Sequence, residues 1–385
     1  MQTHLREAEA IKTDGSRKAI TVAAPAPTTN EEKLHDAEIV DSKIEELQNP
    51  PTLKYTAELA ARAVQPTVWT CGEKDRKEQA ALDPITNQRP FFAFVHVYKT
   101  AGSTVRGFFR EYATICNKSL ALVFACRGSS VKQCQLQAKV NAPQSHKGVS
   151  SAILHDHYDI LGGHLSFGMA DDIFSNATDT TAAHVRHMVF LRQPMARFVS
   201  HILYQQKQRN KNQRDTIEET AEDIKKRVRR YKGKGEYVSS IYKYLLTPTQ
   251  RAMTYDQEQT KEEVVAHKAQ LAIDNLLRYN AIVGMTETFS QSMQLFEHAM
   301  GHTSTSTRKE EEAQEMFSRY IGEEVSRNKS KRKSISTGSV LTELNKDDEF
   351  MAIFREFVKY EQKIFDFALV MHEKQYEAVQ AKSLH

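Results

Sequence analysis

One segment, FFAFVHVYKTAGSTVRGFFR at positions 91–110, constrains the fold more than any other part of the chain. Its apolar run Phe91–Val97 is typical of a buried strand, and later apolar residues recur at helical spacing (Val105, Phe108, Phe109 and Tyr112). Between the two lies Lys99–Thr104, a turn of small and hydroxyl residues that opens with a cation. The N–H groups of such a turn and the N-terminus of the following helix favour an anion at one spot. The segment therefore predicts a phosphate-binding turn in a protein that binds a phosphorylated nucleotide.

Two further segments repeat the order strand, turn, helix. In one, the apolar strand His187–Leu191 precedes a helix that begins at Met195, and in the other the strand Ala281–Met285 precedes a helix from Phe289. Repeated alternation of this kind predicts an α/β fold, here a P-loop-like parallel sheet flanked by helices. Ligands of such sheets bind beyond the carboxyl ends of the strands. Three residues that follow the predicted strands are therefore expected around one crevice: Lys99, Arg192 and Thr286.

The chain divides by composition into an N-terminal extension and a main domain. Residues 1–88 are poor in aromatic residues, and Ala24-Pro25-Ala26-Pro27 and Asn49-Pro50-Pro51 interrupt regular structure there. We expect residues 1–88 to be largely disordered or loosely helical. The nucleotide-binding domain is predicted over residues 89–375, ending in a helix over Asp347–Glu373, with a tail over residues 376–385.

Composition and charge narrow the possible partners. A chain of 385 residues that is 40% hydrophobic can bury a large core, and a net charge of +4 gives no general attraction to nucleic acid, so we expect no nucleic-acid partner. The four cysteines match no zinc-binding spacing. Two alternatives stay open for them: free thiols, or one disulfide among the three that are close in sequence (Cys116, Cys126 and Cys134).

Three motifs occur in a fixed order: HVYKTAGST at 96–104, GGHLSFG at 162–168 and FLRQPMARFVS at 190–200. Together they closely resemble the carbohydrate sulfotransferases of the heparan sulfate 2-O-sulfotransferase type and their microbial relatives. These enzymes have a Lys-Thr-(Ala/Gly)-Gly-(Ser/Thr)-(Ser/Thr) turn, a Gly-His-x-x-Phe-Gly element and an Arg-x-Pro-x-x-Arg-x-x-Ser element. The resemblance extends over about residues 90–373 and is loose outside the motifs.

The resemblance implies a donor, a reaction and a set of site residues. The donor of these enzymes is 3′-phosphoadenosine 5′-phosphosulfate (PAPS), and no metal is implied. The residues Lys99, Thr100, Ala101, Gly102, Ser103 and Thr104 would hold the 5′-phosphosulfate, and Arg192 and Ser200 the 3′-phosphate. The catalytic residues would be His164, as the base that takes a proton from the acceptor hydroxyl, and Lys99, which would neutralise charge on the bridging oxygen.

The acceptor implied by the resemblance is a carbohydrate or glycan hydroxyl. The heparan 2-O enzymes carry a His-Gly-His pattern, and Gly162 takes the place of its first histidine here. This departure bears on the substrate class more than on the reaction type. Such enzymes work in the Golgi lumen or membrane, whereas the chain shows no signal peptide or membrane span, which favours the cytoplasm if the chain is complete. Membrane association would require an anchor that this sequence does not show.

Two residues close to the predicted site residues in the sequence, Arg197 and Glu287, are expected to have structural roles. Arg197 is expected to pair locally or brace the turn. For Glu287 a cap on the helix that follows is favoured over the alternative, which is to orient the turn after the third strand.

Two other functions compete with sulfuryl transfer. A P-loop NTPase or kinase-like enzyme would need G-x-x-x-x-G-K-[ST], but Lys99 precedes the glycine of this turn, and Arg192 stands where an NTPase needs a magnesium-binding Asp. A non-catalytic polyanion-binding protein with the same fold is the second alternative, and the joint presence of His164 and Lys99 argues against it.

Overall fold

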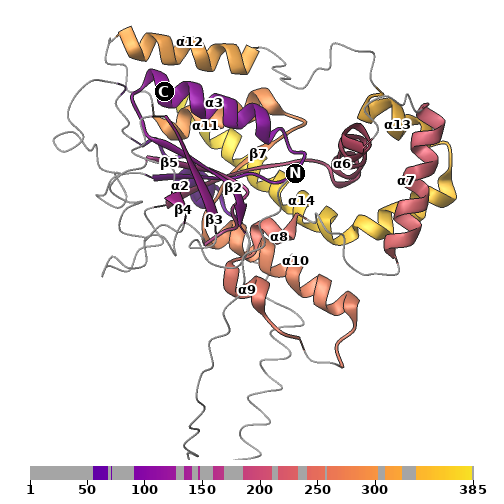
Figure 1. The fold of residues 1–385 in the computed structure, drawn as a ribbon. Helices are drawn as coiled ribbons and strands as arrows, with labels where there is room; N and C mark the ends of the chain where they lie inside the picture. The colour runs from indigo at the N-terminus through magenta and orange to yellow at the C-terminus, as the bar shows by residue number, and fades with distance from the viewer. Residues whose placement is uncertain are drawn as a thin grey trace, which may run out of the picture. The chain divides into compact units, whose positions relative to one another are not determined.

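The computed structural model describes residues 55–67, 71, 91–126, 134–140, 146–147, 159–168, 185–209, 216–232, 241–255, 258–301, 308–322 and 335–383. In these residues a seven-stranded sheet has the order β4-β3-β2-β5-β1-β6-β7 (Figure 1). Its strands are β1 (Phe91–Val95), β2 (Leu120–Cys126), β3 (Cys134–Val140), β4 (His146–Lys147), β5 (Ile160–Gly163), β6 (Val185–Leu191) and β7 (Ile282–Met285). The five strands from β2 to β7 in this order are parallel, which confirms the predicted sheet. The antiparallel pair β3 and β4 at one edge was not predicted.

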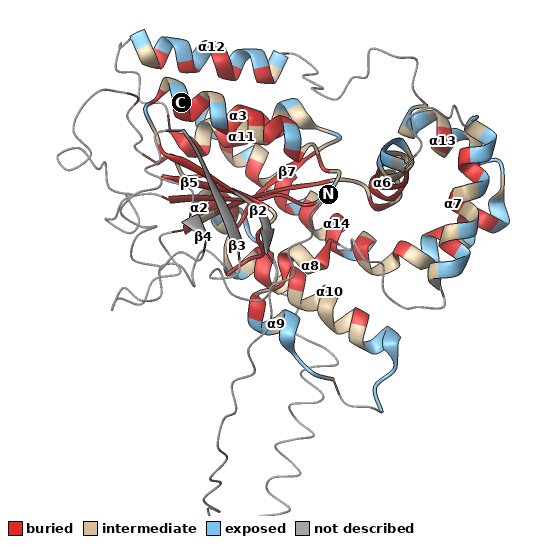
Figure 2. Cartoon of the chain, in the orientation of Figure 1, coloured by how far each residue is buried: buried red, intermediate tan, exposed pale blue. Residues whose placement is uncertain are grey.

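The central strand β1 is buried along its whole length because helices cover both faces of the sheet (Figure 2). Phe92 and Phe94 face a cluster that includes residues of α3 (Gly102–Ile115), α11 (Phe289–Met300) and α12 (Arg308–Gly322). Ala93 and Val95 face a second cluster with α8 (Tyr242–Leu245), α10 (Lys261–Arg278) and part of α14 (Asp348–Ser383). The uninterrupted FFAFV run is thus the pattern of a parallel strand buried on both sides.

A third group of helices has an apolar cluster of its own. It contains α6 (Pro194–Arg209), α7 (Ile217–Lys232), α13 (Thr337–Leu344) and the beginning of α14. Figure 1 shows α6, α7 and α13 together to the right of the sheet, and α6 follows β6 directly in the chain. The short α9 (Pro248–Ala252) begins with a Thr247 capping box and lies between α8 and α10 in the chain.

The long helix α14 covers the outer edge of β7, the last strand of the sheet. Its Gln375 side chain accepts a hydrogen bond from the Val283 N–H (3.0 Å) and donates one to the Ala281 carbonyl (2.8 Å). His372 Nδ1 donates to the Val283 carbonyl (2.8 Å). These side chains take the place of a further strand and form hydrogen bonds with the backbone groups at the outer edge of β7. The helix continues to Ser383, so the predicted tail from residue 376 is mostly helical, and Val379 is buried.

Part of the range 1–88 is packed into this domain. The helix α2 (Ala57–Ala63) begins at the N-cap Thr56, and Ala60 is fully buried. The Tyr55 hydroxyl accepts a hydrogen bond from Gln375 Nε2 (2.8 Å). Within 1–88 the structure describes residues 55–67 and Cys71, where buried tertiary contacts hold an ordered helix. The rest of the predicted extension lies outside the described residues.

A disulfide joins Cys71 to Cys116, the C-cap of α3. Both alternatives of the sequence analysis are therefore wrong for Cys116, whose partner lies outside the three clustered cysteines. Spacing along the chain does not reveal the pairing, because the fold brings together residues 45 positions apart. Cys126 and Cys134 are opposite each other in the register of β2 and β3.

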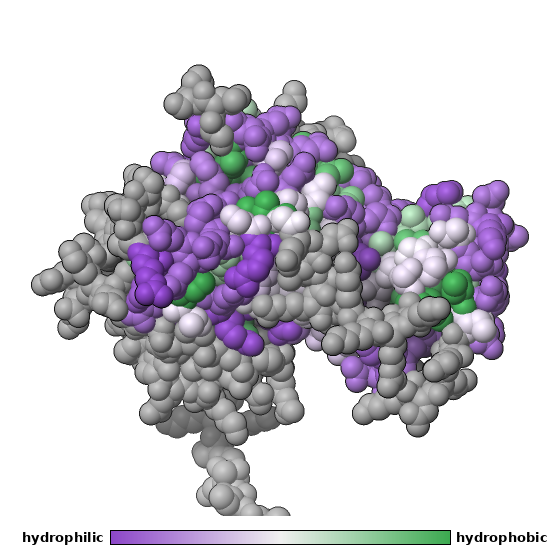
Figure 3. Space-filling view, turned by 90° about the horizontal axis from the view of Figure 1, so that it is seen from above, coloured by the Kyte–Doolittle hydropathy of each residue, from purple (hydrophilic) through white to green (hydrophobic). Residues whose placement is uncertain are grey.

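The described part contains no helix long and apolar enough to cross a membrane. On the face seen in Figure 3, hydrophobic side chains form small separate groups among hydrophilic ones.

Candidate active site

The site lies where the parallel strands β5, β1 and β6 end. The register pairs Val95 with both Gly163 and Val189, so neighbouring strands finish close together. The bonds continue past the strands: the His96 N–H donates to the Gly163 carbonyl (2.7 Å), and the Thr286 N–H donates to the Leu191 carbonyl (2.9 Å). The segments that follow four strands are therefore held at one edge, and those after β1, β6 and β7 are the three that the sequence predicted there.

The turn Lys99–Thr104 has the backbone of an anion-binding loop. Lys99 (φ 68°) and Ala101 (φ 58°) both adopt the left-handed conformation, which is uncommon for residues other than glycine. The buried Thr100 hydroxyl donates to the Val97 carbonyl (3.0 Å) and holds the turn in place. The N–H groups of Gly102 and Ser103 belong to the first turn of α3, where a helix offers its own N–H groups no acceptor. Strained backbone and available donors together form a pre-organised cradle.

Gly102 is required by the ring of His96. A Cβ atom at position 102 would lie 1.7 Å from Cδ2 of His96. The His96 side chain is 5% exposed and rests on the first residue of α3. The glycine of the turn therefore makes room for a neighbouring side chain at the base of the cradle, a role that the sequence analysis did not assign.

Lys99 and Arg192 lie next to each other. Nη1 of Arg192 is 3.4 Å from the Lys99 carbonyl, which accepts its hydrogen bond, and Nζ of Lys99 lies 4.6 Å from the ring centroid of Tyr204. Burial and the charges of Arg192 and Lys207 lower the pKa of Lys99. Neighbouring cations repel one another, and a bound anion relieves this repulsion. The cations and the N–H groups of the cradle therefore form a site that favours an anion.

The turn after β6 is held by the turn after β7. Oε1 of Glu287 accepts a hydrogen bond from the Gln193 N–H (3.0 Å), and Gln193 Oε1 accepts one from the Ala196 N–H (2.7 Å). The expectation that Glu287 caps its own helix is wrong: α11 has Thr288 as N-cap, without a side-chain cap bond. Glu287 instead orients the turn that carries Arg192, and its charge acts on that guanidinium.

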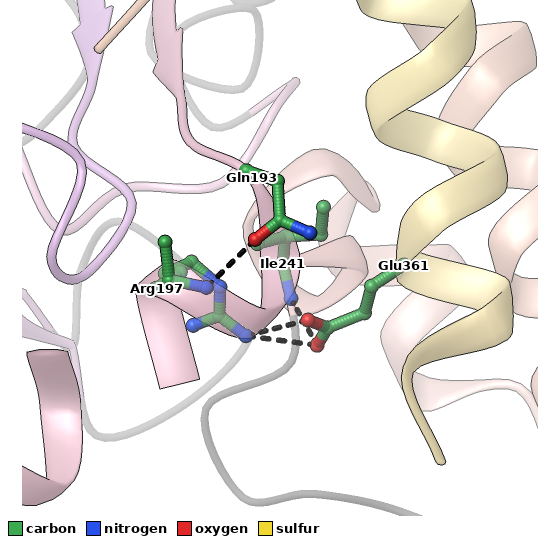
Figure 4. Close-up of polar contacts among 5 residues, drawn as sticks. Gln193, Arg197, Ile241 and Glu361 are labelled. Carbon is green, nitrogen blue, oxygen red and sulfur yellow. Dashed lines mark hydrogen bonds and ion pairs between the residues drawn. The ribbon is translucent and has the colours of Figure 1, made fainter. Parts of the chain in front are cut away.

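Arg197 and Ser200 lie on α6. Arg197 is fully buried and donates from Nη2 to both oxygens of Glu361 on α14 (2.9 and 2.7 Å), and the same carboxylate accepts from the Ile241 N–H (3.1 Å; Figure 4). The ion pair of Arg197 is therefore long-range, with a partner 164 positions away in the sequence, and not local as expected. Ser200 is half-buried on the following turn. The buried ion pair fixes the position of α6, on which Ser200 depends.

His164 is held in one tautomer. Its Nδ1 lies 3.0 Å from the His96 carbonyl, which can only accept, so Nδ1 carries the hydrogen and Nε2 the lone pair. The ring lies between two others: its centroid is 4.4 Å from that of His96 and 4.2 Å from that of Tyr98, with tilts of 22° and 19°. Burial and the charge of Arg106 lower the pKa of His164, against the opposing effect of the bond to His96. The result is a neutral imidazole with its basic nitrogen in a fixed direction.

Gly162 faces apolar side chains. A Cβ at this position would lie 3.2 Å from Leu122 and 3.7 Å from Phe94. A histidine here would enter the core between the sheet and α3. The packing around position 162 therefore explains why glycine, and not the first histidine of the His-Gly-His pattern, is found there.

The fold and site define a class: an α/β protein with a phosphate-type cradle, two adjacent cations and a neutral histidine at the carboxyl edge of a parallel sheet. A family model described as the Sulfotransferase family matches residues 83–368, and the chain belongs to this family. Comparison with curated proteins gave no match. The described residues contain no group of three or more His, Cys, Asp or Glu side chains placed to hold a metal ion.

All the predicted site residues fall in the described part, and Lys99, Arg192 and His164 meet at one edge of the sheet. Sequence reasoning missed His96, Tyr98 and Tyr204. His96 and Tyr98 belong to the same motif as Lys99, so their position directly before the turn was a signal in the sequence that could have identified them. Tyr204 is four residues after Ser200, one turn along the same helix.

Proposed function

We propose that this sulfotransferase-family protein transfers a sulfuryl group from PAPS to a hydroxyl of a carbohydrate or glycan acceptor. The observation that carries the proposal is the fixed direction of His164. Its Nδ1 is bound to the His96 carbonyl, so the free nitrogen is a base that can accept a proton. A base of this kind beside an anion cradle is the pair of groups that sulfuryl transfer to an alcohol requires.

The residues present fit the donor. The N–H groups of the turn and Lys99 suit the 5′-phosphosulfate, and Arg192, whose fork-shaped guanidinium matches phosphate oxygens, suits the 3′-phosphate together with Ser200. Lys99 and Arg192 are adjacent, so one nucleotide can reach both cations. The family membership supports this assignment, since its members transfer sulfuryl groups.

The reaction balances with these residues alone. The acceptor oxygen attacks sulfur while its proton passes to Nε2 of His164. The bond between sulfur and the bridging oxygen of the donor breaks, and 3′,5′-adenosine bisphosphate leaves. Lys99 stabilises the negative charge that develops on that bridging oxygen, and the N–H groups of the cradle stabilise the remaining phosphate oxygens.

The carbohydrate acceptor rests on the three motifs, which resemble those of glycan sulfotransferases. The disulfide Cys71–Cys116 adds support for an oxidising compartment such as the Golgi lumen, because disulfides persist there and are rare in the cytosol. Thiol labelling of protein from its native cell with and without reductant tests this point. Full labelling of Cys71 before reduction contradicts a luminal location.

One assay separates this function from its alternatives. Purified protein is incubated with ³⁵S-labelled PAPS and a glycan panel, and calorimetry compares 3′,5′-adenosine bisphosphate with ATP. We expect labelled glycan and a clear preference for the bisphosphate. A preference for ATP indicates an NTPase or kinase, and bisphosphate or glycan binding without turnover indicates a non-catalytic polyanion-binding protein.

A further inference from the structure

Two exposed tyrosines flank the groups that carry the proposed chemistry. Among the large hydrophobic side chains of the described residues, four are exposed: Tyr98 (37%), Tyr204 (46%), Met253 (43%) and Val370 (43%). Tyr98 stacks on His164, and Tyr204 lies under Nζ of Lys99. Scattered exposed apolar residues are ordinary on a protein surface. Two tyrosines against two reactive groups in one site call for a functional explanation.

The two tyrosines belong to one surface. His201 precedes Tyr204 by less than one helical turn, and its ring centroid is 6.3 Å from that of Tyr98 in an edge-on contact. The charge of Lys99 also acts on His201. Tyr244 extends the same surface, with its ring 5.9 Å from Tyr98 and 6.3 Å from His164. Aromatic side chains from the β1 turn, α6 and α8 therefore meet beside the base and the cation.

Geometry places the acceptor against this surface. The reacting hydroxyl must reach Nε2 of His164 and, through sulfur, the bridging oxygen near Lys99. His96 and Tyr98 cover both faces of the His164 ring, so the hydroxyl approaches in the plane of the imidazole. Tyr98 and Tyr204 are the exposed side chains that flank these two groups, so they lie where the remainder of an acceptor can contact the protein.

We propose that Tyr98 and Tyr204 form the acceptor platform, on which sugar rings of the acceptor rest by their apolar faces while hydroxyls point to His164. A tyrosine side chain is rigid, so it offers a large contact area and loses little conformational entropy on binding. Its hydroxyl can form hydrogen bonds with water when no acceptor is bound. Sugar rings suit such side chains because one face presents C–H groups and the rim presents hydroxyls. This inference rests on the proposed function and assigns its acceptor-binding residues.

The test measures acceptor binding without turnover. His164→Ala protein is saturated with 3′,5′-adenosine bisphosphate and titrated by calorimetry with hexasaccharides of N-acetylheparosan, chondroitin and cellulose. The hexasaccharide that the wild-type protein sulfates best is the probe. Tyr98→Leu and Tyr204→Leu are then added singly to the His164→Ala background, with Tyr98→Phe, Tyr204→Phe and Val370→Ala as matched controls.

We expect each leucine variant to weaken binding of the probe about tenfold, which corresponds to about 1.4 kcal/mol. Each phenylalanine variant and Val370→Ala should stay within about threefold of the background protein, because the ring face or the whole site is retained. Affinity for the bisphosphate should be unchanged in all of them.

Other outcomes overturn the inference, and they do so in distinguishable ways. If the leucine variants bind the probe as the background does, the platform is elsewhere, although the proposed function stands. If affinity for the bisphosphate falls as much as affinity for the probe, the tyrosines support the fold of the site only. If the wild-type protein sulfates none of the hexasaccharides, the carbohydrate acceptor itself is wrong and the inference falls with it.

Discussion

Nδ1 of His164 donates its hydrogen to the main-chain carbonyl of His96, 3.0 Å away, and this bond decides which nitrogen can act as a base. The carbonyl belongs to the residue that leads from β1 toward the cradle. The proposed base and the cradle are therefore positioned by the same short stretch of chain. A side chain at position 96 could vary without removing the bond, but a displacement of the backbone there would move both parts of the site.

Removal of the proposed base should separate catalysis from nucleotide binding. We expect His164→Ala to lower kcat by about 10² to 10⁴-fold, the usual contribution of a general base. Affinity for 3′,5′-adenosine bisphosphate should stay near that of the wild-type protein, because no cradle residue changes. Turnover assays and calorimetry measure the two quantities, with His267→Ala on α10 as a control histidine. Retention of most of the activity by His164→Ala would show that another residue is the base.

The pH dependence should report a base that is neutral well into the acid range. Burial and Arg106 lower the pKa of His164 below the ordinary value of 6.5. A base with a lowered pKa stays neutral until the pH falls through that value, so kcat/KM should be constant near neutral pH and decrease only in acid. Arg106→Gln removes a positive charge and should move the acid limb to higher pH. A limb centred above 6.5 in the wild-type protein contradicts this prediction.

Arg192 should matter mainly for holding the nucleotide. Its guanidinium lies beside Lys99, and charge-assisted hydrogen bonds contribute about 1.5 to 3 kcal/mol each. We expect Arg192→Ala to weaken bisphosphate binding by about 10- to 150-fold, by calorimetry, and Arg192→Lys to restore only part of it because the fork is lost. Arg278→Ala, far along α10, serves as a charge-matched control. An Arg192→Ala protein with normal affinity and low kcat would place Arg192 in the chemical step instead.

The fit between His96 and Gly102 can be tested by a double-mutant cycle. A Cβ at position 102 would overlap the His96 ring, so Gly102→Ala should lower the free energy of unfolding by about 1 to 3 kcal/mol and distort the cradle. Truncation of the ring in His96→Ala/Gly102→Ala should recover much of that loss, which denaturant unfolding measures. Additive effects of the two substitutions would mean that the ring is not the obstacle.

Local pattern was sufficient to predict the parallel sheet. In the FFAFV run and the strand–turn–helix repeats, the apolar residues recur with a different period in strands than in helices, so the elements can be told apart. Parallel pairing then places the ends of the strands, and the ligand site, at one edge of the sheet. Lys99 and Arg192 could therefore be placed together from sequence. The orientation of His164 could not, because it depends on a bond to the carbonyl of a residue 68 positions earlier.

Other features depend on contacts that a single sequence does not display. Cys71 and Cys116 pair because α3 ends beside a segment that composition alone marks as disordered. Glu287 looks like a helix cap from its position, yet the neighbouring turn after β6 offers its carboxylate a better donor, the Gln193 N–H. In both cases a tertiary contact outweighed the local tendency.

The ion pair between Arg197 and Glu361 should be a large contributor to the stability of the site's scaffold. Removing one partner leaves a buried charge without compensation, so Arg197→Met and Glu361→Gln should each cost about 3 to 5 kcal/mol of unfolding free energy. Urea unfolding measures this, and Glu343→Gln, which breaks the more exposed pair with Lys346, should cost less than about 1 kcal/mol. Because α6 carries Ser200, the bisphosphate affinity of Glu361→Gln should fall as well. Wild-type stability in both single variants would show that α6 is held by apolar packing alone.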